Sequence, residues 1–208
     1  MLAALTTAVL LATGTMDPIA FAEQRFNQAA SYRTTVHSWS AHGARSEIRY
    51  SYRKPGYIRM DFLEPHRGAT LIYNPNTHKV RVWPFGVGSL PALTLSPANP
   101  LLRDGSGHRV DQSDVGSLLR NIRTLQRGGE IMTLGEETLG RRPALHLAIK
   151  GAAGSSVAGI HRYQIWLDAG LGFPLRVISY AVGDEPLETV QMDDMEVNAS
   201  FPNHFFDP

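Results

Sequence analysis

The sequence predicts an α+β domain of mostly antiparallel β structure: a curved, incompletely closed half-barrel of about ten strands, with an N-terminal helix and a lid helix in its mouth. Three observations predict it. Apolar and polar residues alternate over most of the chain, two segments have helical periodicity, and a proline- and glycine-rich stretch separates two groups of strands. A large sheet with one apolar face and two covering helices is expected to curl around an apolar cavity.

The composition is that of one folded domain. The chain has 208 residues, of which 43% are hydrophobic and 19% charged. Its 20 Lys and Arg residues against 19 acids give a net charge of +1, without a basic cluster, so nucleic acid is not an expected partner. Cysteine is absent, which excludes disulfides and thiolate nucleophiles.

Residues 1–15 are uncharged and apolar. The stretch is shorter than the roughly 20 residues that span a bilayer, but it suits the apolar region of a signal peptide. Ala12 and Gly14 occupy the two positions that a signal peptidase reads. We therefore expect a signal peptide over 1–15, an exported, periplasmic protein that does not span the membrane, and a single domain over 16–208. A buried N-terminal helix is the alternative.

The first helix is predicted from Asp17-Pro18 to about residue 31. Asp can cap the free N–H groups and Pro suits the first helical position. From residue 32 the period changes to two, and the pattern predicts strands over 32–41, 46–54, 57–63, 68–73 and 78–83. After the middle of the chain, strands are predicted over 130–134, 143–150, 161–168, 174–181 and 188–198.

The strand alternation predicts an apolar row. Ile58, Met60 and Phe62 share one face of their strand, opposite Arg59 and Asp61. The neighbouring strands are expected to add further apolar residues to this row. The predicted cavity lining is therefore Ile58, Met60, Phe62, Leu71, Val80 and Val82.

The middle segment predicts a lid. Residues 84–107 are rich in Pro and Gly and are expected to be loop rather than sheet. Asp111 or Ser113 is then expected to cap a helix that runs to about Gln126. The apolar face of this lid helix carries Val115, Leu118, Leu119 and Ile122.

Several motifs in this order resemble the LolA/LolB/RseB superfamily of periplasmic bacterial proteins, and an uncharacterised branch of it most of all. They are the stretch 52–62 with Lys54-Pro55, the pairs 71–74 and 80–84, the segments 93–101 and 107–116, and the ending around Asp168, Phe173-Pro174, Asp193 and Phe205. The resemblance implies a half-open β-barrel with a helical lid, and in the best-known members a cavity for the acyl chains of lipoproteins.

The resemblance also implies roles for individual positions. Ile58, Met60 and Phe62 fall where the lipoprotein carrier has cavity-lining residues. The carrier's lid is latched by an arginine just before the strand-turn proline; here that position is Lys54, with Arg53 beside it. Lysine is a compact point charge and does not make the forked contacts of arginine.

The first functional hypothesis is a periplasmic, non-catalytic carrier or binder of an apolar ligand of the acyl-chain or lipoprotein type. Its partners would be a lipid or acylated protein, together with inner-membrane export machinery or another envelope protein. The alternative is an RseB-like envelope sensor or scaffold that binds a protein partner.

An enzyme ranks last, and no cofactor is expected. The sequence has no G-x-S-x-G elbow, P-loop or dinucleotide fingerprint, and the neighbours Asp193 and Asp194 point to opposite faces of a strand. Its 8 histidines include no HExxH motif, so no metal site is predicted; His108, beside the lid, is the one to watch.

Overall fold

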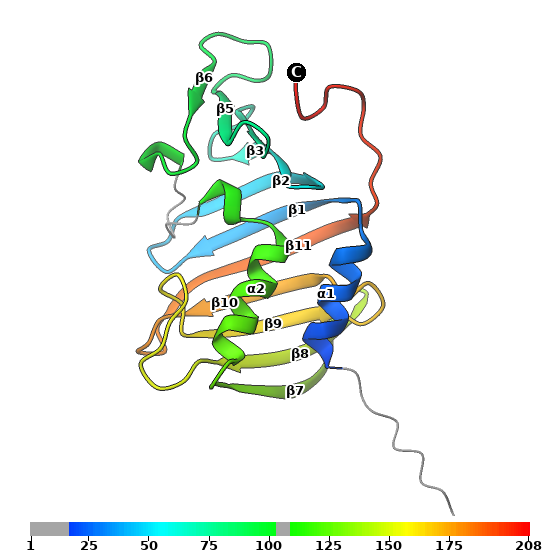
Figure 1. Cartoon of the computed structure of the whole chain (residues 1–208), viewed down its shortest axis with the longest axis vertical. Helices are drawn as coiled ribbons and strands as arrows, with labels where there is room; N and C mark the ends of the chain where they lie inside the picture. The colour runs from blue at the N-terminus through cyan, green and yellow to red at the C-terminus, as the bar shows by residue number, and fades with distance from the viewer. Residues whose placement is uncertain (1–16, 103–108) are drawn as a thin grey trace, which may run out of the picture.

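The computed structural model describes residues 17–102 and 109–208, which form one antiparallel sheet with two α-helices on one face (Figure 1). The strand order is β6-β5-β4-β3-β2-β1-β11-β10-β9-β8-β7, and the sheet does not close on itself. The elements are α1 (Pro18–Gln28), β1 (Ser31–Ser40), β2 (Arg45–Arg53), β3 (Tyr57–Glu64), β4 (Thr70–Asn74), β5 (Lys79–Trp83), β6 (Leu93–Leu95), η1 (Pro100–Leu102), η2 (Val110–Gln112), α2 (Val115–Gln126), β7 (Glu130–Leu139), β8 (Arg142–Lys150), β9 (Arg162–Asp168), β10 (Pro174–Tyr180) and β11 (Pro186–Val197). The predicted half-barrel with two helices is confirmed, with eleven strands instead of about ten.

The sheet consists of two meanders that meet along one seam. Strands β1 to β6 pair in sequence order, and so do β7 to β11. The seam is the antiparallel pairing of β1 with β11, which runs from Tyr32 opposite Val197 to Ser40 opposite Glu188. The first and last strands of the chain therefore lie side by side in the middle of the sheet.

Helix α1 begins where the sequence predicts. The N–H of Ile19 donates to Oδ1 of Asp17 at 2.9 Å, and Pro18 follows the cap. Ile19, Ala22 and Phe26 form its buried stripe against the sheet. Local capping and apolar spacing are sufficient to explain this helix.

Helix α2 begins slightly later than predicted, because its cap is Asp114 rather than Asp111 or Ser113. Oδ1 of Asp114 accepts from the N–H of Ser117 at 3.1 Å. Asp111 instead belongs to η2 and pairs with Arg109 at 2.8 Å. Ser113 donates to the carbonyl of Val110 at 2.7 Å. Both alternative caps are thus committed to the short helix that precedes α2.

The two helices pack closely and are linked by ion pairs. At Gly116 of α2, a Cβ atom would lie 2.4 Å from Cε1 of Phe26 in α1, so the close approach requires glycine. The guanidinium of Arg123 bridges from α2 to Asp17 at 2.5 Å and to Glu23 at 2.8 Å. These contacts hold α1 and α2 together as one layer over the sheet.

The prediction that residues 84–107 are loop rather than sheet is wrong over three residues. Leu93–Leu95 forms β6, which pairs with β5. This strand is short because Pro91 and Pro97 flank it, and proline cannot donate to a ladder. β7 is longer than predicted, because a register shift at Gly135 lets pairing with β8 resume.

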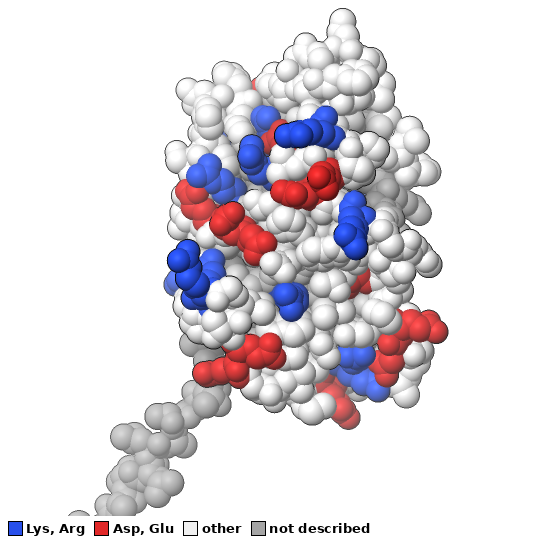
Figure 2. Space-filling view, turned by 180° about the vertical axis from the view of Figure 1, so that it is seen from behind, with Lys and Arg blue, Asp and Glu red and all other residues white. Residues whose placement is uncertain are grey.

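The face of the sheet that lies behind the helices is polar. Figure 2 shows Lys and Arg side chains interspersed with Asp and Glu across this face. One such pair is Arg33 with Glu196, joined at 2.6 Å across β1 and β11. In the described part of the chain, no helix is long and apolar enough to cross a bilayer. The predicted signal peptide and His108 lie outside the described residues.

Candidate ligand-binding cavity

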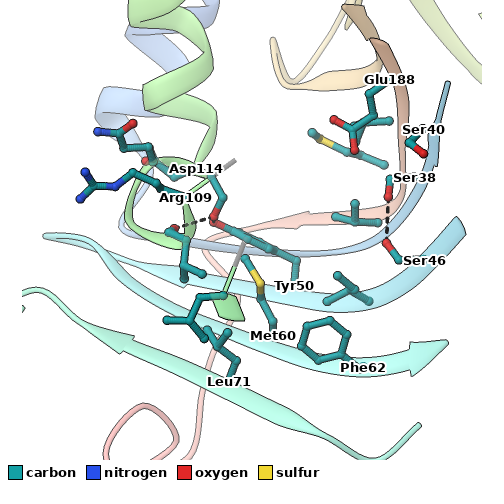
Figure 3. A pocket seen from close by; sticks show the side chains of 18 of the residues that line it. Ser38, Ser40, Ser46, Tyr50, Met60, Phe62, Leu71, Arg109, Asp114 and Glu188 are labelled. Atoms are coloured by element: carbon teal, nitrogen blue, oxygen red, sulfur yellow. Dashed lines mark hydrogen bonds between the residues drawn. The ribbon is translucent and has the colours of Figure 1, made fainter. Parts of the chain in front are cut away.

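A cavity of about 640 Å³ lies on the concave face of the sheet, beneath the beginning of α2. Strands β1, β2 and β3 form much of its floor, with contributions from β4, β5, β9, β10 and β11. Figure 3 shows Met60, Phe62 and Leu71 along this floor, with Arg109 and Asp114 at one side and Ser38, Ser46 and Glu188 at the other. The volume lies within the range of about 300–1,000 Å³ that is common for small-molecule sites.

The floor is a continuous apolar surface produced by strand register. Met60 lies opposite Leu71, and Leu71 lies opposite Val82. Phe62 lies opposite Ile48 on the neighbouring strand. Met60, Phe62 and Val82 are only half-buried, although they occupy the inner face of the sheet. The described residues do not cover them completely, so the space above them is open to a ligand.

The six residues predicted to line the cavity fall into two groups. Met60, Phe62, Leu71 and Val82 line it. Ile58 and Val80 have the predicted inward orientation, but they are 1% and 0% exposed in the packed core and are not part of the lining. Aromatic side chains fill the concave face above Ile58 and Val80.

That aromatic packing is dense. Tyr32 and Tyr52 stack with ring centroids 5.0 Å apart, and the ring of Phe26 from α1 lies 5.6 Å from Tyr52. Tyr52 lies opposite Ile58 in the sheet register. The rings close this end of the concave face, and the cavity begins on their far side, at Tyr50 and Met60.

The predicted lid residues divide in the same way. Val115 and Leu118 line the cavity, as does Asn121 one turn further along α2. Their spacing of three residues places them on one side of the helix. Leu119 and Ile122 are 2% and 0% exposed and face the core instead. Helix α2 thus roofs the cavity with one flank and is anchored by the other.

A hydrogen-bonded chain fixes the start of this roof. The N–H of Val115 donates to the hydroxyl of Tyr32 at 3.1 Å, and the hydroxyl of Tyr50 lies 3.2 Å from Oγ of Ser113. Burial raises the pKa of both tyrosines well above the ordinary value, and the charge of Asp114 raises it further. The two phenols are therefore neutral at any physiological pH.

The two residues predicted as a lid latch have other partners. Lys54 donates to the backbone carbonyl of Asn27 at 2.5 Å, at the end of α1, and lies 5.8 Å from the ring of Phe26. The guanidinium of Arg53 lies 4.8 Å from the ring of Phe206 in the C-terminal segment. Both side chains contact elements other than α2.

The residue that joins the helices is Arg123, which sequence reasoning missed. A lone arginine on the polar flank of an amphipathic helix looks solvent-exposed, and its acidic partners lie about a hundred residues earlier in the chain. The serines of the cavity wall were missed as well, because they interrupt the apolar alternation by which the inner face is recognised. Among the described residues, no three His, Cys, Asp or Glu side chains gather into a metal site.

Comparisons with known proteins concern the fold of the chain. No protein-family model and no curated protein sequence matches the chain. An uncharacterized conserved protein from Thermus thermophilus is similar in structure, with a TM-score of 0.57 and 11% identity over 92% of this chain and 94% of that one. The lipoprotein LppX of Mycobacterium tuberculosis has a TM-score of 0.52 and 10% identity over 89% of this chain and 95% of that one.

A third similar structure is that of the MucA/MucB complex of Pseudomonas aeruginosa, with a TM-score of 0.52 and 17% identity over 90% of this chain. The match covers 61% of the Pseudomonas chain, so our chain spans less than two thirds of its length. The chain shares its fold with these three structures. At these identities the likeness concerns the fold alone. In that fold the cavity described above lies between the sheet and its helices.

Proposed function

We propose that this protein is an exported binder or carrier of an apolar ligand of the acyl-chain or lipoprotein type, held on the concave face of the sheet beneath α2. The observation that carries the proposal is the incompletely covered floor of Met60, Phe62 and Val82. A core that served stability alone would bury these side chains against others.

The energetics suit an alkyl chain. Transfer of each methylene from water contributes about 0.8 kcal/mol, so roughly ten buried methylenes contribute about 8 kcal/mol. Ordering the ligand and the protein offsets part of this gain. The remainder is compatible with an affinity useful to a carrier that must also release its ligand.

The test compares two methionine variants. Diphenylhexatriene, a fluorescent hydrocarbon without hydrogen-bonding groups, reports occupancy of an apolar cavity. We expect Met60→Asp to weaken its binding at least tenfold, because the carboxylate would have to be desolvated beside the probe. Met132→Asp is the matched control, since Met132 is 55% exposed on strand β7 and lies outside the cavity. Circular dichroism verifies that both variants are folded.

Native mass spectrometry of gently purified protein is the companion measurement. A co-purifying lipid that Met60→Asp loses and Met132→Asp retains would support the proposal. A wild-type protein that is consistently free of lipid, and that takes up neither diphenylhexatriene nor a fluorescent fatty acid, would refute it.

Export is part of the proposal. Residues 1–15 would direct secretion, and residues 16–208 would form the mature domain. N-terminal sequencing of protein recovered from a periplasmic fraction tests this directly. A mature protein that begins after residue 14 or 15 supports it, and an intact Met1 in the cytosolic fraction contradicts it.

The second candidate is an envelope sensor or scaffold that binds a protein partner. The observation that favours it is the exposure of three large apolar side chains around the β5–β6 connection and η1: Phe85 at 75%, Leu90 at 87% and Leu101 at 80%. The structure of MucB in its complex with MucA is similar to this chain. Loss of a co-purifying protein from Leu90→Asp, with diphenylhexatriene binding intact, would favour this function over the first.

A further inference from the structure

The cavity has two polar ends, and the hydroxyls of the first are bonded to one another. Ser113 donates its hydroxyl hydrogen to the carbonyl of Val110 at 2.7 Å, so the contact between Tyr50 and Ser113 requires Tyr50 to be the donor. The hydroxyl hydrogens of Ser113 and Tyr50 therefore both have acceptors within the protein.

The second end is open. Oγ of Ser38 and Oγ of Ser46 lie 2.8 Å apart across β1 and β2. The pair has two hydroxyl hydrogens, and the contact between them uses one. Ser40 accepts from the N–H of Ala44 at 3.1 Å, which leaves its own hydrogen to donate. In residues 17–102 and 109–208, the remaining hydrogen of the Ser38–Ser46 pair has no other protein partner.

These serines line the cavity and are half-buried, at the end where the β1–β2 hairpin is exposed (Figure 3). Strand register extends the row across the sheet, since Ser40 lies opposite Glu188 and Glu188 lies opposite Ser179. Both are strongly buried, with 7% and 5% exposure, and both line the cavity. Glu188 has an interaction of its own, and Ser179 donates to the backbone carbonyl of Glu188 at 3.5 Å, so these two residues form the polar wall beside the serines.

The three serines form a neutral hydrogen-bonding site. Hydroxyl donors suit an ester or hydroxyl oxygen. Recognition of a phosphate or other strong anion usually employs arginine or lysine. Among the described lining residues the cationic side chains are Arg45, exposed on the hairpin, and Arg109, which is paired with Asp111.

We propose that the serine end, formed by Ser38, Ser40 and Ser46, binds an uncharged oxygen-bearing group of an acylated ligand. The group is an ester or hydroxyl, as in a neutral acylglycerol, and its chain lies over Met60 and Phe62. This inference rests on the proposed function, because it assigns the polar part of the ligand whose apolar part the floor holds. The polar group lies near the cavity opening and the chain lies inside.

The test separates the two parts of the ligand. The affinity for diphenylhexatriene reports binding to the apolar floor alone. Displacement of this probe by a monoacylglycerol with an 18-carbon chain gives an affinity to which both the floor and the serine end contribute. We expect Ser38→Ala/Ser46→Ala to weaken the monoacylglycerol about fivefold to tenfold relative to diphenylhexatriene, which is the effect of one lost hydrogen bond. Thr189→Ala, on β11 but outside the cavity lining, is the control. It should leave the ratio of the monoacylglycerol affinity to the diphenylhexatriene affinity unchanged.

The outcomes distinguish this inference from the proposed function. If the wild type binds both compounds and the serine variant keeps the wild-type ratio, the serine end has no role in recognition, while the apolar function stands. If octadecanoate binds more tightly than the monoacylglycerol and loses as much affinity in the serine variant, the site selects an anion and the assignment is wrong. If the wild type binds no diphenylhexatriene, the proposed function fails and the inference fails with it.

Discussion

Gly116 is the position at which one methyl group should disturb the lid most. A Cβ there would lie 2.4 Å from Cε1 and 2.8 Å from Cζ of Phe26, and 2.8 Å from Oδ1 of Asp114. Non-bonded carbon atoms are normally about 3.5–4.0 Å apart. Gly116→Ala must therefore move the aromatic ring, displace the capping carboxylate or separate the two helices.

Two opposing terms set the change in the free energy of unfolding of Gly116→Ala. Alanine is favoured over glycine inside a helix by about 1 kcal/mol. Overpacking of a close contact costs about 1–3 kcal/mol, and we take the upper half of this range because both the ring and the cap are affected. The free energy of unfolding should therefore fall by about 1–2 kcal/mol in Gly116→Ala.

Urea unfolding followed by tryptophan fluorescence measures this change. Thr124→Ala, on the exposed side of the same helix, is the control for helix propensity and should leave stability unchanged or slightly higher. Phe26→Leu in the Gly116→Ala background removes the ring from the contact, so the penalty of the added methyl should shrink in this background. A Gly116→Ala protein as stable as the wild type, or more stable, would refute the packing argument.

The remaining predictions concern the attachment of the helices. Tyr32→Phe leaves the buried N–H of Val115 without an acceptor and should lower the free energy of unfolding by about 1–3 kcal/mol in urea titrations; no loss would mean that another acceptor takes over. Arg123→Met should cost up to about 1 kcal/mol, because the ion pairs are partly exposed, and the cost should shrink in high salt; a salt-independent loss would point to packing instead. Burial raises the pKa of Asp17, but hydrogen bonds from Arg123 and Ile19 outweigh it and lower the pKa below its usual 3.8. Asp17→Asn keeps the cap and removes the charge. The wild type should therefore be more stable than this variant by the full amount above about pH 4, and the difference in stability should disappear as the pH falls further. Thermal melts from pH 7 to pH 3 test this, and a gap between the two proteins that widens in acid would contradict it.

The strands were predictable because alternation reports directly which residues share a face. The inward orientation of Met60, Phe62, Leu71 and Val82 follows from that pattern alone. Alternation does not report where along a strand the covering helices end. Ile58 therefore looked equivalent to Met60, although packed aromatic rings cover the first and open space lies above the second.

Two other features depend on contacts between distant segments. Strand β6 is only three residues long, and it forms because the edge of β5 is available for pairing. The serine end of the cavity combines residues from two strands, and serine on an inner face carries no apolar signal. Its polar character becomes visible when the register places Ser38 against Ser46.

The seam between β1 and β11 has a consequence for how the molecule is assembled. Every other strand pairing in the described sheet joins neighbours in sequence, so each meander can form from local hairpins. The pairing of β1 with β11 instead closes a loop that contains most of the chain. The entropic cost of closing this loop is therefore paid in that single pairing step. Because β11 is the last strand of the described sheet to be synthesised, the two halves stay unjoined until then, each with an apolar face uncovered. Joining at the seam should therefore limit the folding rate, and a chaperone would be needed most before that step.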